Sequence, residues 1–404
     1  MNVLIVNAGS SSLKYQLFNT ETKTVLAKGG CERIGEKGGN ISHKVPEKTP
    51  YEKNQELQNH EDAIKLVIET LTDKEVGCIA SMDEIGAVGH RVVHGGPYFT
   101  GSVLATEDVL AKVELCKELA PLHIGPSLVG IHACMDVMKN VPQVLVFDTA
   151  FHSTMPEEAY TFAIPREYSE KYHIRRYGFH GSSHRYVSRE MIQILGKPAE
   201  ETKIVTCHLG NGSSIAAVKG GKVIDTTMGF TPLDGLMMGT RSGAIDPAIV
   251  SFLMEKENLS ADQINNILNK KSGILGVYGA SSDFRDCRMA MEEKKDPRAT
   301  LAIRMLAYQV KKYIGAYTAA MGGLDAVVFT AGIGENNNII RAMPCEGLEF
   351  LGIEIDHAVN DGIKRPIQTT KISTENSKVQ VYLIPTNEEL IIAEDTESVV
   401  SALK

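Results

Sequence analysis

The 404-residue sequence lacks the features of several large protein classes. No stretch approaches the ~18 uninterrupted apolar residues of a membrane-spanning helix, so we expect no membrane partner. The formal net charge of −8 argues against general nucleic-acid binding, which requires a basic surface. An anionic small molecule is still compatible with this charge, because such a ligand needs only a local cluster of arginine and lysine.

The cysteines do not form a recognisable framework. They are seven in number, widely scattered and without any CxxC pair, so neither a disulfide network nor a zinc site is predicted. The opening MNVLIVNAG lacks the charged start and long apolar run of a signal peptide. We therefore expect a reducing, cytoplasmic location.

Several common enzyme signatures are also missing. GxxxxGK[ST] does not occur, which argues against a Walker-type nucleotidase. The serine-hydrolase elbow GxSxG is absent too. The turn Gly332-Ile333-Gly334 lacks the third glycine of GxGxxG, which disfavours a dinucleotide-binding fold.

The pattern that is present predicts an α/β protein. Short β-branched runs alternate with longer amphipathic segments, and the length exceeds what one hydrophobic core usually holds, so we expect two domains. The predicted strands are Val3–Asn7, Leu13–Phe18, Val144–Phe147, Ile204–His208, Ile215–Lys219, Ala326–Thr330 and Val379–Ile384. The predicted helices are Asp62–Leu71, Ser127–Met138, Ser183–Leu195, Ser260–Asn269 and Pro297–Met321.

Two distant segments share one arrangement. VLIVNAGSSSLKYQLF, from Val3, and KIVTCHLGNGSSIAAVKGG, from Lys203, each consist of a strand, a small polar turn and a second strand. This similarity indicates a duplication into two similar domains that face one another. A chance likeness of two hairpins is the alternative. The boundary is predicted near Ala150, without a Pro/Gly-rich or charged linker.

Three glycine-containing turns offer backbone amides to an anion. Asn7–Ser12, followed by Lys14, is suited to a phosphate or a hydrated Mg²⁺, although by itself it equally fits a polar hairpin turn. His208–Ser214 is the matching turn of the second half. Ala331–Glu335 follows a strand and precedes a helix-like segment, an arrangement in which nucleotides commonly bind.

Arginines and carboxylates supply the remaining candidates. Arg91 and Arg241 are framed by glycine and small residues, and the planar guanidinium suits carboxylate or phosphate. Asp148 ends a predicted strand, where α/β active-site residues tend to lie. Glu388 is either functional or simply part of the first turn of the last helix. Asp283-Phe284-Arg285 alone fits a structural turn.

His180 and His184 have the i, i+4 spacing of zinc ligands on a helix. The glutamate of HExxH is missing and Gly181 interrupts the segment. A metal pair is therefore disfavoured, and a structural or helix-start role is expected for His184.

Taken together, these segments resemble the acetate kinase family over nearly the whole chain. The matching motifs run in the family's order from residue 2 to about residue 395: NAGSSSLKY, GHRVVHGG, FDTAFH, RRYGFHGSSH, HLGNGSS, MGFTPLDGLMMGTRSGAIDP, TAGIGENN and PTNEEL. The resemblance implies two actin-like, ribonuclease H-like domains with the active site in the cleft between them. It places residues 1–149 and 386–404 in the first domain and residues 150–385 in the second, which would mediate a homodimer.

The resemblance also implies roles for individual residues. Asn7 and Glu388 would organise Mg²⁺, for which Mn²⁺ can substitute, and Lys14 would approach the phosphates of ATP. Arg91, Arg241 and His180 would hold the reacting groups, with Asp148 as the catalytic carboxylate. A small apolar pocket would accept the substrate methyl group, lined by Val93, Leu122, Phe179 and Pro232. The loops around ATP would be His208, Leu209, Gly210, Asn211 and Gly212; Asp283, Phe284 and Arg285; and Ala331, Gly332, Ile333, Gly334 and Glu335.

This candidate set agrees with the chemistry of transfer to a carboxylate. Acetate is ionised at pH 7, because carboxylic acids titrate near ~4, so attack on phosphorus needs no strong base. It does need two anions to be aligned and charge to be neutralised on the phosphoryl oxygens. A propionate or butyrate kinase is the nearest alternative, and a non-enzymatic actin-like ATP-binding protein is the alternative from another class.

Overall fold

The computed structural model describes residues 1–403, apart from the side chain of Leu122. The chain forms two compact units. The first contains Met1–Phe151 and the chain from Asn387 onward, and the second contains His152–Thr386. Among the described residues, no helix is both long and apolar enough to cross a membrane.

Each unit contains one mixed sheet. The first has the order β5-β4-β3-β2-β1-β6-β8-β7 and the second β11-β10-β9-β12-β14-β13. The strands of the first sheet are β1 (Asn2–Ala8), β2 (Ser12–Asn19), β3 (Thr24–Glu32), β4 (Asn40–Lys44), β5 (Tyr51–Asn54), β6 (Ile85–Val92), β7 (Val103–Leu104) and β8 (Gln143–Phe147). Those of the second are β9 (Lys203–Leu209), β10 (Ser213–Lys219), β11 (Lys222–Thr226), β12 (Ala326–Thr330), β13 (Thr370–Lys371) and β14 (Gln380–Leu383).

Five strands of each sheet share one topology, which confirms the predicted duplication. In the first unit β1 pairs antiparallel with β2 and parallel with β6, and β6 pairs parallel with β8. In the second unit β9 has the same relation to β10 and β12, and β12 pairs parallel with β14. The carboxyl ends of three parallel strands therefore meet at one edge of each sheet, the usual place for a ligand in such folds.

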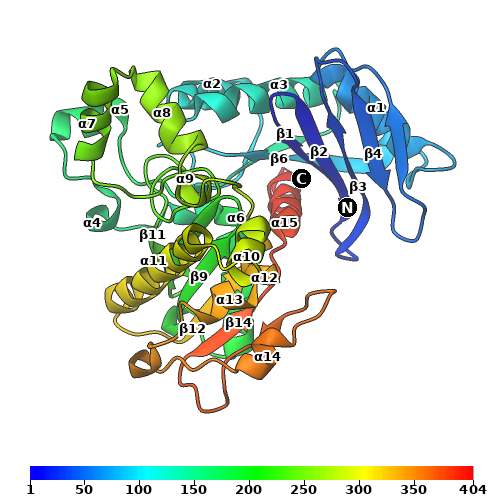
Figure 1. Ribbon diagram of the computed structural model, residues 1–404. Coiled ribbons are helices and arrows are strands. Elements are labelled where there is room, and N and C mark those ends of the chain that lie inside the picture. Colours follow the sequence, from blue (N-terminus) through cyan, green and yellow to red (C-terminus); the bar gives the residue numbers. More distant parts are fainter. Residues whose placement is uncertain (404) are drawn as a thin grey trace. The chain divides into compact units, whose positions relative to one another are not determined.

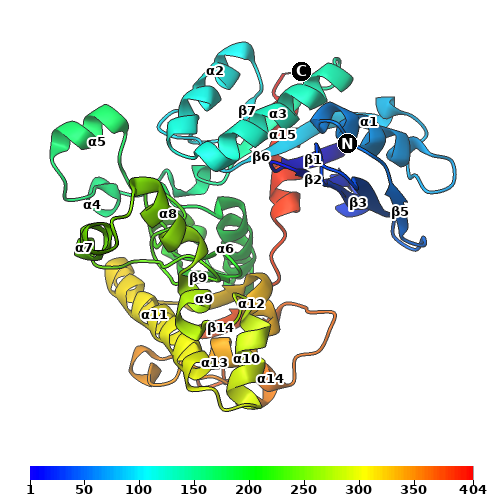
Figure 2. The same cartoon turned by 45° about the horizontal axis from the view of Figure 1, so that its top comes forward.

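Helices cover both faces of each sheet. In the first unit α1 (His60–Thr72) and α3 (Pro121–Val137) pack on one face, and α15 (Glu388–Ser401) packs against β1, β6 and β8 from the other (Figure 1). In the second unit α11 (Pro297–Met321) and α6 (Gly181–Leu195) lie on opposite sides of β9 (Figure 2). The other helices are α2 (Glu107–Leu115), α4 (Glu157–Tyr160), α5 (Arg166–Tyr172), α7 (Ala248–Glu257), α8 (Ala261–Lys270), α9 (Gly273–Tyr278), α10 (Phe284–Glu292), α12 (Ala331–Asn336), α13 (Asn338–Ala342) and α14 (His357–Asp361).

Burial on both faces explains why the central strands read as continuous apolar runs. Leu4 and Val6 belong to the cluster that α1 and α3 complete, whereas Val3 and Ile5 point to the opposite face and are also buried. The seven predicted strands and five predicted helices are confirmed in type. Two expected turns are helical instead. Ala331–Glu335 belongs to α12, although it precedes a further helix, α13, as expected. Phe284 and Arg285 form the start of α10.

Candidate functional site

The turn between β1 and β2 presents Asn7 and Lys14 together. The two residues are direct cross-strand partners, so their side chains lie on the same face of the sheet. The turn is closed by a hydrogen bond from the Gly9 amide to the Ser12 carbonyl at 2.8 Å. His60 Nε2 lies 2.8 Å from the Gly9 carbonyl oxygen and supports the turn from α1. An amide oxygen and a cation are thus presented side by side on a short, braced hairpin.

The ends of β6 and β8 bring Arg91 and Asp148 into direct contact. Arg91 donates from Nε to Asp148 Oδ1 at 2.9 Å and from Nη2 to Oδ2 at 2.7 Å. Parallel pairing explains the contact, because Val92 pairs with Phe147 and the Asp148 amide donates to the Val92 carbonyl. The Asp148 side chain is 2% exposed and that of Arg91 is 26% exposed. The Asp148 carboxylate therefore fixes one edge of a guanidinium whose remaining surface is still accessible.

Glu388 joins this group from the start of α15. Its Oε2 lies 4.0 Å from Arg91 Nη2, and Asn387 caps the helix by accepting from the Leu390 amide. The helix approaches so closely because Gly89 of β6 has no side chain: a Cβ there would lie 2.4 Å from Thr396 Oγ1. Burial raises the pKa of Glu388 to about 7, and the carboxylates of Asp148 and Glu389 act in the same direction against the opposing effect of Arg91.

The donors in this unit suit Mg²⁺ better than a softer metal. Asn7, Asp148 and Glu388 offer only oxygen ligands, which Mg²⁺ prefers, usually with waters and substrate phosphates completing its shell. Within residues 1–403, no group of three or more His, Cys, Asp or Glu side chains forms a metal cage. These few oxygen ligands thus fit a Mg²⁺ ion that takes most of its remaining ligands from water and from the phosphates of a nucleotide.

The second unit places His180 at the start of α6. His180 is the N-cap residue and has a left-handed backbone, with φ of +59°. Its Nδ1 lies 2.8 Å from Ser214 Oγ, and its ring stacks on that of His208 at 4.1 Å between centroids. The Nε2 atom faces Gly212, because a Cβ added there would lie 3.3 Å from it. The ring is therefore held in one orientation beside the β9–β10 turn.

His184 has the structural role that we predicted for it. The residue is fully buried within α6, with Nδ1 2.7 Å from Thr206 Oγ1 and Nε2 2.7 Å from Ser214 Oγ. Burial holds its pKa well below the usual value, with contributions from His152 and His208. His184 is thus neutral and braces Ser214, the same hydroxyl that contacts His180.

Arg241 approaches the Gly212 turn from the same side as His180. A Cβ on Gly212 would lie 3.5 Å from Arg241 Nη1 and 3.3 Å from His180 Nε2, so the two side chains meet beside this glycine. Arg241 Nη1 donates to the Pro232 carbonyl at 3.1 Å and contacts Met238 Sδ at 3.5 Å. Within residues 1–403, no carboxylate lies within ion-pair distance of Arg241. Burial lowers its pKa, which indicates a desolvated cation without an anionic partner.

The proposed nucleotide segments lie at the carboxyl ends of β9 and β12. Thr330 pairs with His208 in the parallel ladder, so the β9–β10 turn and α12 are neighbours. Gly332 is exposed, and a Cβ there would meet nothing within 4 Å, which leaves its backbone accessible. Asp283 caps α10 through the Arg285 amide, whereas the ring of Phe284 packs in the core of this unit.

The four residues predicted for the methyl pocket are distributed over both units. Val93 follows β6 in the first unit and is half-buried. In the second, Phe179 is buried and Pro232 is half-buried beside Arg241. The side chain of Leu122 lies outside the described part of the structure.

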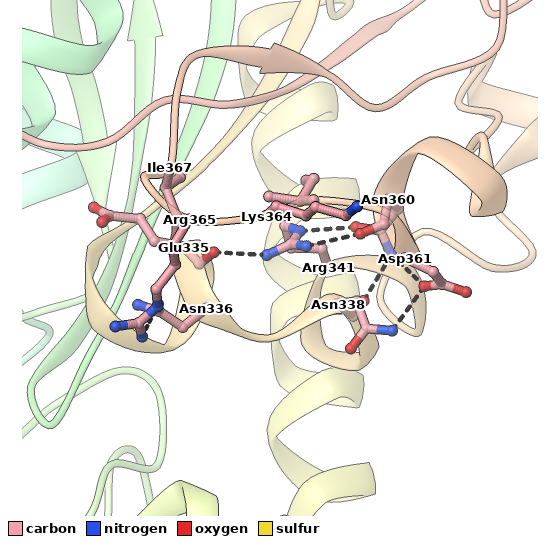
Figure 3. Close-up of a pocket in the computed structure, with 10 residues that line it drawn as sticks. Glu335, Asn336, Asn338, Arg341, Asn360, Asp361, Lys364, Arg365 and Ile367 are labelled. Atoms are coloured by element: carbon pink, nitrogen blue, oxygen red, sulfur yellow. Dashed lines mark hydrogen bonds between the residues drawn. The ribbon is translucent and has the colours of Figure 1, made fainter.

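Arg341 is a buried arginine that the sequence motifs did not single out. Figure 3 shows it beside a cavity of about 140 Å³. It donates to the carbonyls of Gly334 and Glu335 in α12 and to the side chain and carbonyl of Asn360 in α14. No local sequence pattern predicts that Arg341 connects α12 and α14, because these two helices are separate segments of the chain.

The duplicated sheets, with Arg91 and Asp148 at strand ends of the first unit and His180 and Arg241 beside one glycine in the second, fit a phosphotransferase of the actin-like fold. The sequence model of the acetokinase family matches residues 2–394. The chain therefore belongs to the acetokinase family, whose members transfer a phosphoryl group to a carboxyl acceptor.

Individual relatives agree with this family. The acetate kinase of Thermoanaerobacter pseudethanolicus is 57% identical over 404 residues, which cover 100% of both chains. A crystal structure of Porphyromonas gingivalis acetate kinase superposes with a TM-score of 0.95 at 47% identity, covering 99% of each chain. A propionate kinase from Francisella tularensis gives 0.91 at 41% identity, covering 98% of this chain and 99% of its own.

Proposed function

We propose that this chain is a cytoplasmic, Mg²⁺-dependent acetate kinase that reversibly converts acetate and ATP to acetyl phosphate and ADP. The observation that carries the proposal is the 57% sequence identity to an acetate kinase over the full length of both chains. The desolvated, carboxylate-free Arg241 beside His180 supports it, because a transferring phosphoryl group supplies the missing anion.

The reaction requires one bond to form and one to break. A carboxylate oxygen of acetate attacks the γ-phosphorus in line, and the bond to the bridging oxygen breaks with its electron pair going to ADP. No proton is removed from the nucleophile, since acetate is already ionised. We propose that Arg91 orients the acetate, while Arg241 and His180 neutralise charge on the phosphoryl oxygens.

We propose that Asp148 orients Arg91. Its buried carboxylate engages two guanidinium nitrogens, and such a bidentate pair fixes both position and direction. Direct transfer needs no phosphorylated protein side chain, and Lys14 with the glycine-containing turns holds the phosphates during the step.

Asn7 and Glu388 are proposed to hold the Mg²⁺ of the nucleotide, which would supply positive charge against the phosphates. A proton competes with the metal for Glu388, whose pKa lies at about 7. The Mg²⁺ concentration for half-maximal activity should therefore rise as the pH falls below about 7. Glu388→Gln should lower kcat and flatten this dependence, whereas Glu389→Gln should keep it but shift it to lower pH, because the exposed Glu389 carboxylate helps to raise the pKa of Glu388. If the Mg²⁺ titrations of Glu388→Gln and of the wild type coincide between pH 5.5 and 8, Glu388 does not have the proposed metal role.

Val93 is proposed to limit the length of the acyl chain. One methylene in a tight apolar site shifts discrimination by ~1–3 kcal/mol. Val93→Ala should therefore raise relative activity on propionate, mainly through a lower KM. The measurement is the acetate-to-propionate ratio of kcat/KM, and an unchanged ratio would remove Val93 from the pocket. Val103→Ala, in the short edge strand β7, is a control for general loosening of this unit.

A homodimer is proposed to form through the second unit. Leu301 and Tyr308 of α11 are 52% and 63% exposed and lie on one face of the helix, at i, i+7 spacing, whereas Met305 between them packs partly against the core. Exposed apolar faces of this kind mark protein interfaces. Light scattering should report a dimer for the wild type and a shift towards monomer for Tyr308→Glu. A monomeric wild type would contradict the proposal.

The acceptor can be identified in a single assay. Acyl phosphate is trapped with hydroxylamine while acetate, propionate and butyrate are compared at equal concentration. We expect acetate to give the highest kcat/KM, in keeping with the 57% and 47% identity to the two acetate kinases named above, against 41% to the propionate kinase. A preference for propionate would reassign the substrate, and ATP binding without any acyl phosphate would favour a non-enzymatic actin-like protein.

A further inference from the structure

Glu335 lies in a nucleotide segment, yet its carboxylate is directed at the protein backbone. Oε1 accepts from the Ala331 amide at 2.9 Å and from the Thr386 amide at 3.0 Å, with Thr330 Oγ1 at 3.4 Å. Figure 3 shows its side chain turned away from Arg341. A carboxylate used in this way repels rather than attracts a nearby polyphosphate, so it is poorly suited to be a nucleotide ligand.

The first of these contacts stabilises the strained first residue of α12. Ala331 has a left-handed backbone with φ of +64°, a conformation that residues with a Cβ rarely adopt. The N-cap residue of α12, Thr330, makes no side-chain capping bond. Glu335 takes over that duty by accepting from the first amide of its own helix.

The second contact connects this helix to a distant part of the chain. Thr386 follows β14 and directly precedes Asn387 and Glu388, the cap and first residue of α15. Its hydroxyl is 2.8 Å from Ser183 Oγ, which is 2.7 Å from His208 Nδ1. Thr386 is thus tied to α12 through its amide and to the β9 end through its hydroxyl.

We propose that Glu335 is a positioning residue that couples the proposed nucleotide segment, Ala331–Asn336, to the chain leading into Glu388. A change in the position of α12 would move Thr386 through its hydrogen bond to Glu335. Thr386 is two peptide bonds before Glu388, the residue that we propose organises Mg²⁺, so Glu388 would move with it. The inference rests on the proposed function, because it assigns the two ends of the connection to the nucleotide and its metal.

The test compares Glu335→Ala, Glu335→Gln and Glu346→Ala, the last being an exposed carboxylate in the same region without a role in the site. Glu335→Ala should lower kcat at least tenfold and raise the half-maximal Mg²⁺ concentration at least threefold. Its Kd for metal-free ATP should change less than threefold, because no direct contact is lost. Glu335→Gln keeps an acceptor oxygen of the same reach and should recover most of the kcat, while Glu346→Ala should match the wild type.

Coupling can be measured directly with a double variant. In a Glu388→Gln background, Glu335→Ala should no longer change the Mg²⁺ requirement, since the two residues act through one connection. Weaker metal-free ATP binding with a normal Mg²⁺ requirement would make Glu335 a nucleotide ligand and overturn the inference. A lower Tm with unchanged kinetics at 25 °C would reduce it to a purely structural residue. If the wild type forms no acyl phosphate, the proposed function itself fails. If the wild type is active and the Glu335 variants give either of these two contrary results, only the role of Glu335 is refuted.

Discussion

Arg241→Ala should lower kcat by about 10³–10⁵, as expected for an arginine that neutralises a transferring phosphoryl group. This corresponds to roughly 4–7 kcal/mol at about 1.4 kcal/mol per decade. The large effect follows from the absence of a neighbouring carboxylate among the described residues, which leaves the desolvated charge of Arg241 available to substrate. ATP binding should be largely retained, because the backbone around Gly212 and Gly332 is unchanged.

Two further measurements separate charge from geometry at this position. Arg241→Lys keeps the charge but loses the planar fork, so it should remain strongly impaired. Guanidine added to Arg241→Ala should restore part of the turnover if a missing cation is the only defect. A near-normal kcat with a raised KM for acetate alone would make Arg241 a ground-state clamp and pass the neutralising role to Arg91 and His180.

Asp148→Asn should lower kcat by about 10²-fold or more, the loss expected when a reacting group is misplaced by about 1 Å. The amide has one acceptor oxygen where the carboxylate has two, and its NH₂ group opposes the guanidinium donors. Arg91 then loses its bidentate partner and part of its orientation. The KM for acetate should rise together with the fall in kcat, since Arg91 is proposed to hold the acetate.

A double variant identifies the route through which Asp148 acts. If Asp148 works through Arg91, then Arg91→Ala combined with Asp148→Asn should be no worse than the more damaging single change. Asp395→Asn, a carboxylate of the same unit that accepts from Ser102, should retain full activity. Strictly multiplicative losses in the double variant would instead assign Asp148 an independent role in the chemistry.

Local sequence predicted much of the fold because its central strands are unambiguous. Val3–Asn7, Ile204–His208 and Ala326–Thr330 are rich in β-branched residues and are bounded by small turn residues, which favours strands of these lengths. The internal repeat then indicated the duplicated topology. These signals lie within single segments, so no knowledge of long-range contacts was needed.

The strand that carries Arg91 was not among those predicted. β6 contains Gly86 and Gly89, and glycine lowers the strand signal of a sequence. The reason for Gly89 becomes apparent only when α15 packs on it from the far end of the chain. The close packing of α15 therefore explains the glycine at position 89, which local strand propensity alone disfavours.

The internal contacts of the site also depended on pairing between distant segments. Arg91 was predicted as a substrate ligand, but its bidentate bond to Asp148 follows from the register of β6 against β8. In the same way, Glu335 was predicted to contact nucleotide because it lies in a glycine-containing motif. Its bond to the Thr386 amide depends on the parallel neighbours β12 and β14, which no local motif specifies.

Transfer of label from ATP is the most direct test of the central claim, that phosphate passes straight from the nucleotide to acetate. The chain is incubated with γ-³²P-labelled ATP and Mg²⁺, with and without acetate, and both small-molecule products and protein are counted. With acetate, the label should appear in hydroxylamine-reactive acetyl phosphate. Without acetate, the protein should stay unlabelled and no exchange between ATP and ADP should occur. Stoichiometric label on the protein that is chased into acetyl phosphate would contradict direct transfer and require a covalent intermediate on the chain.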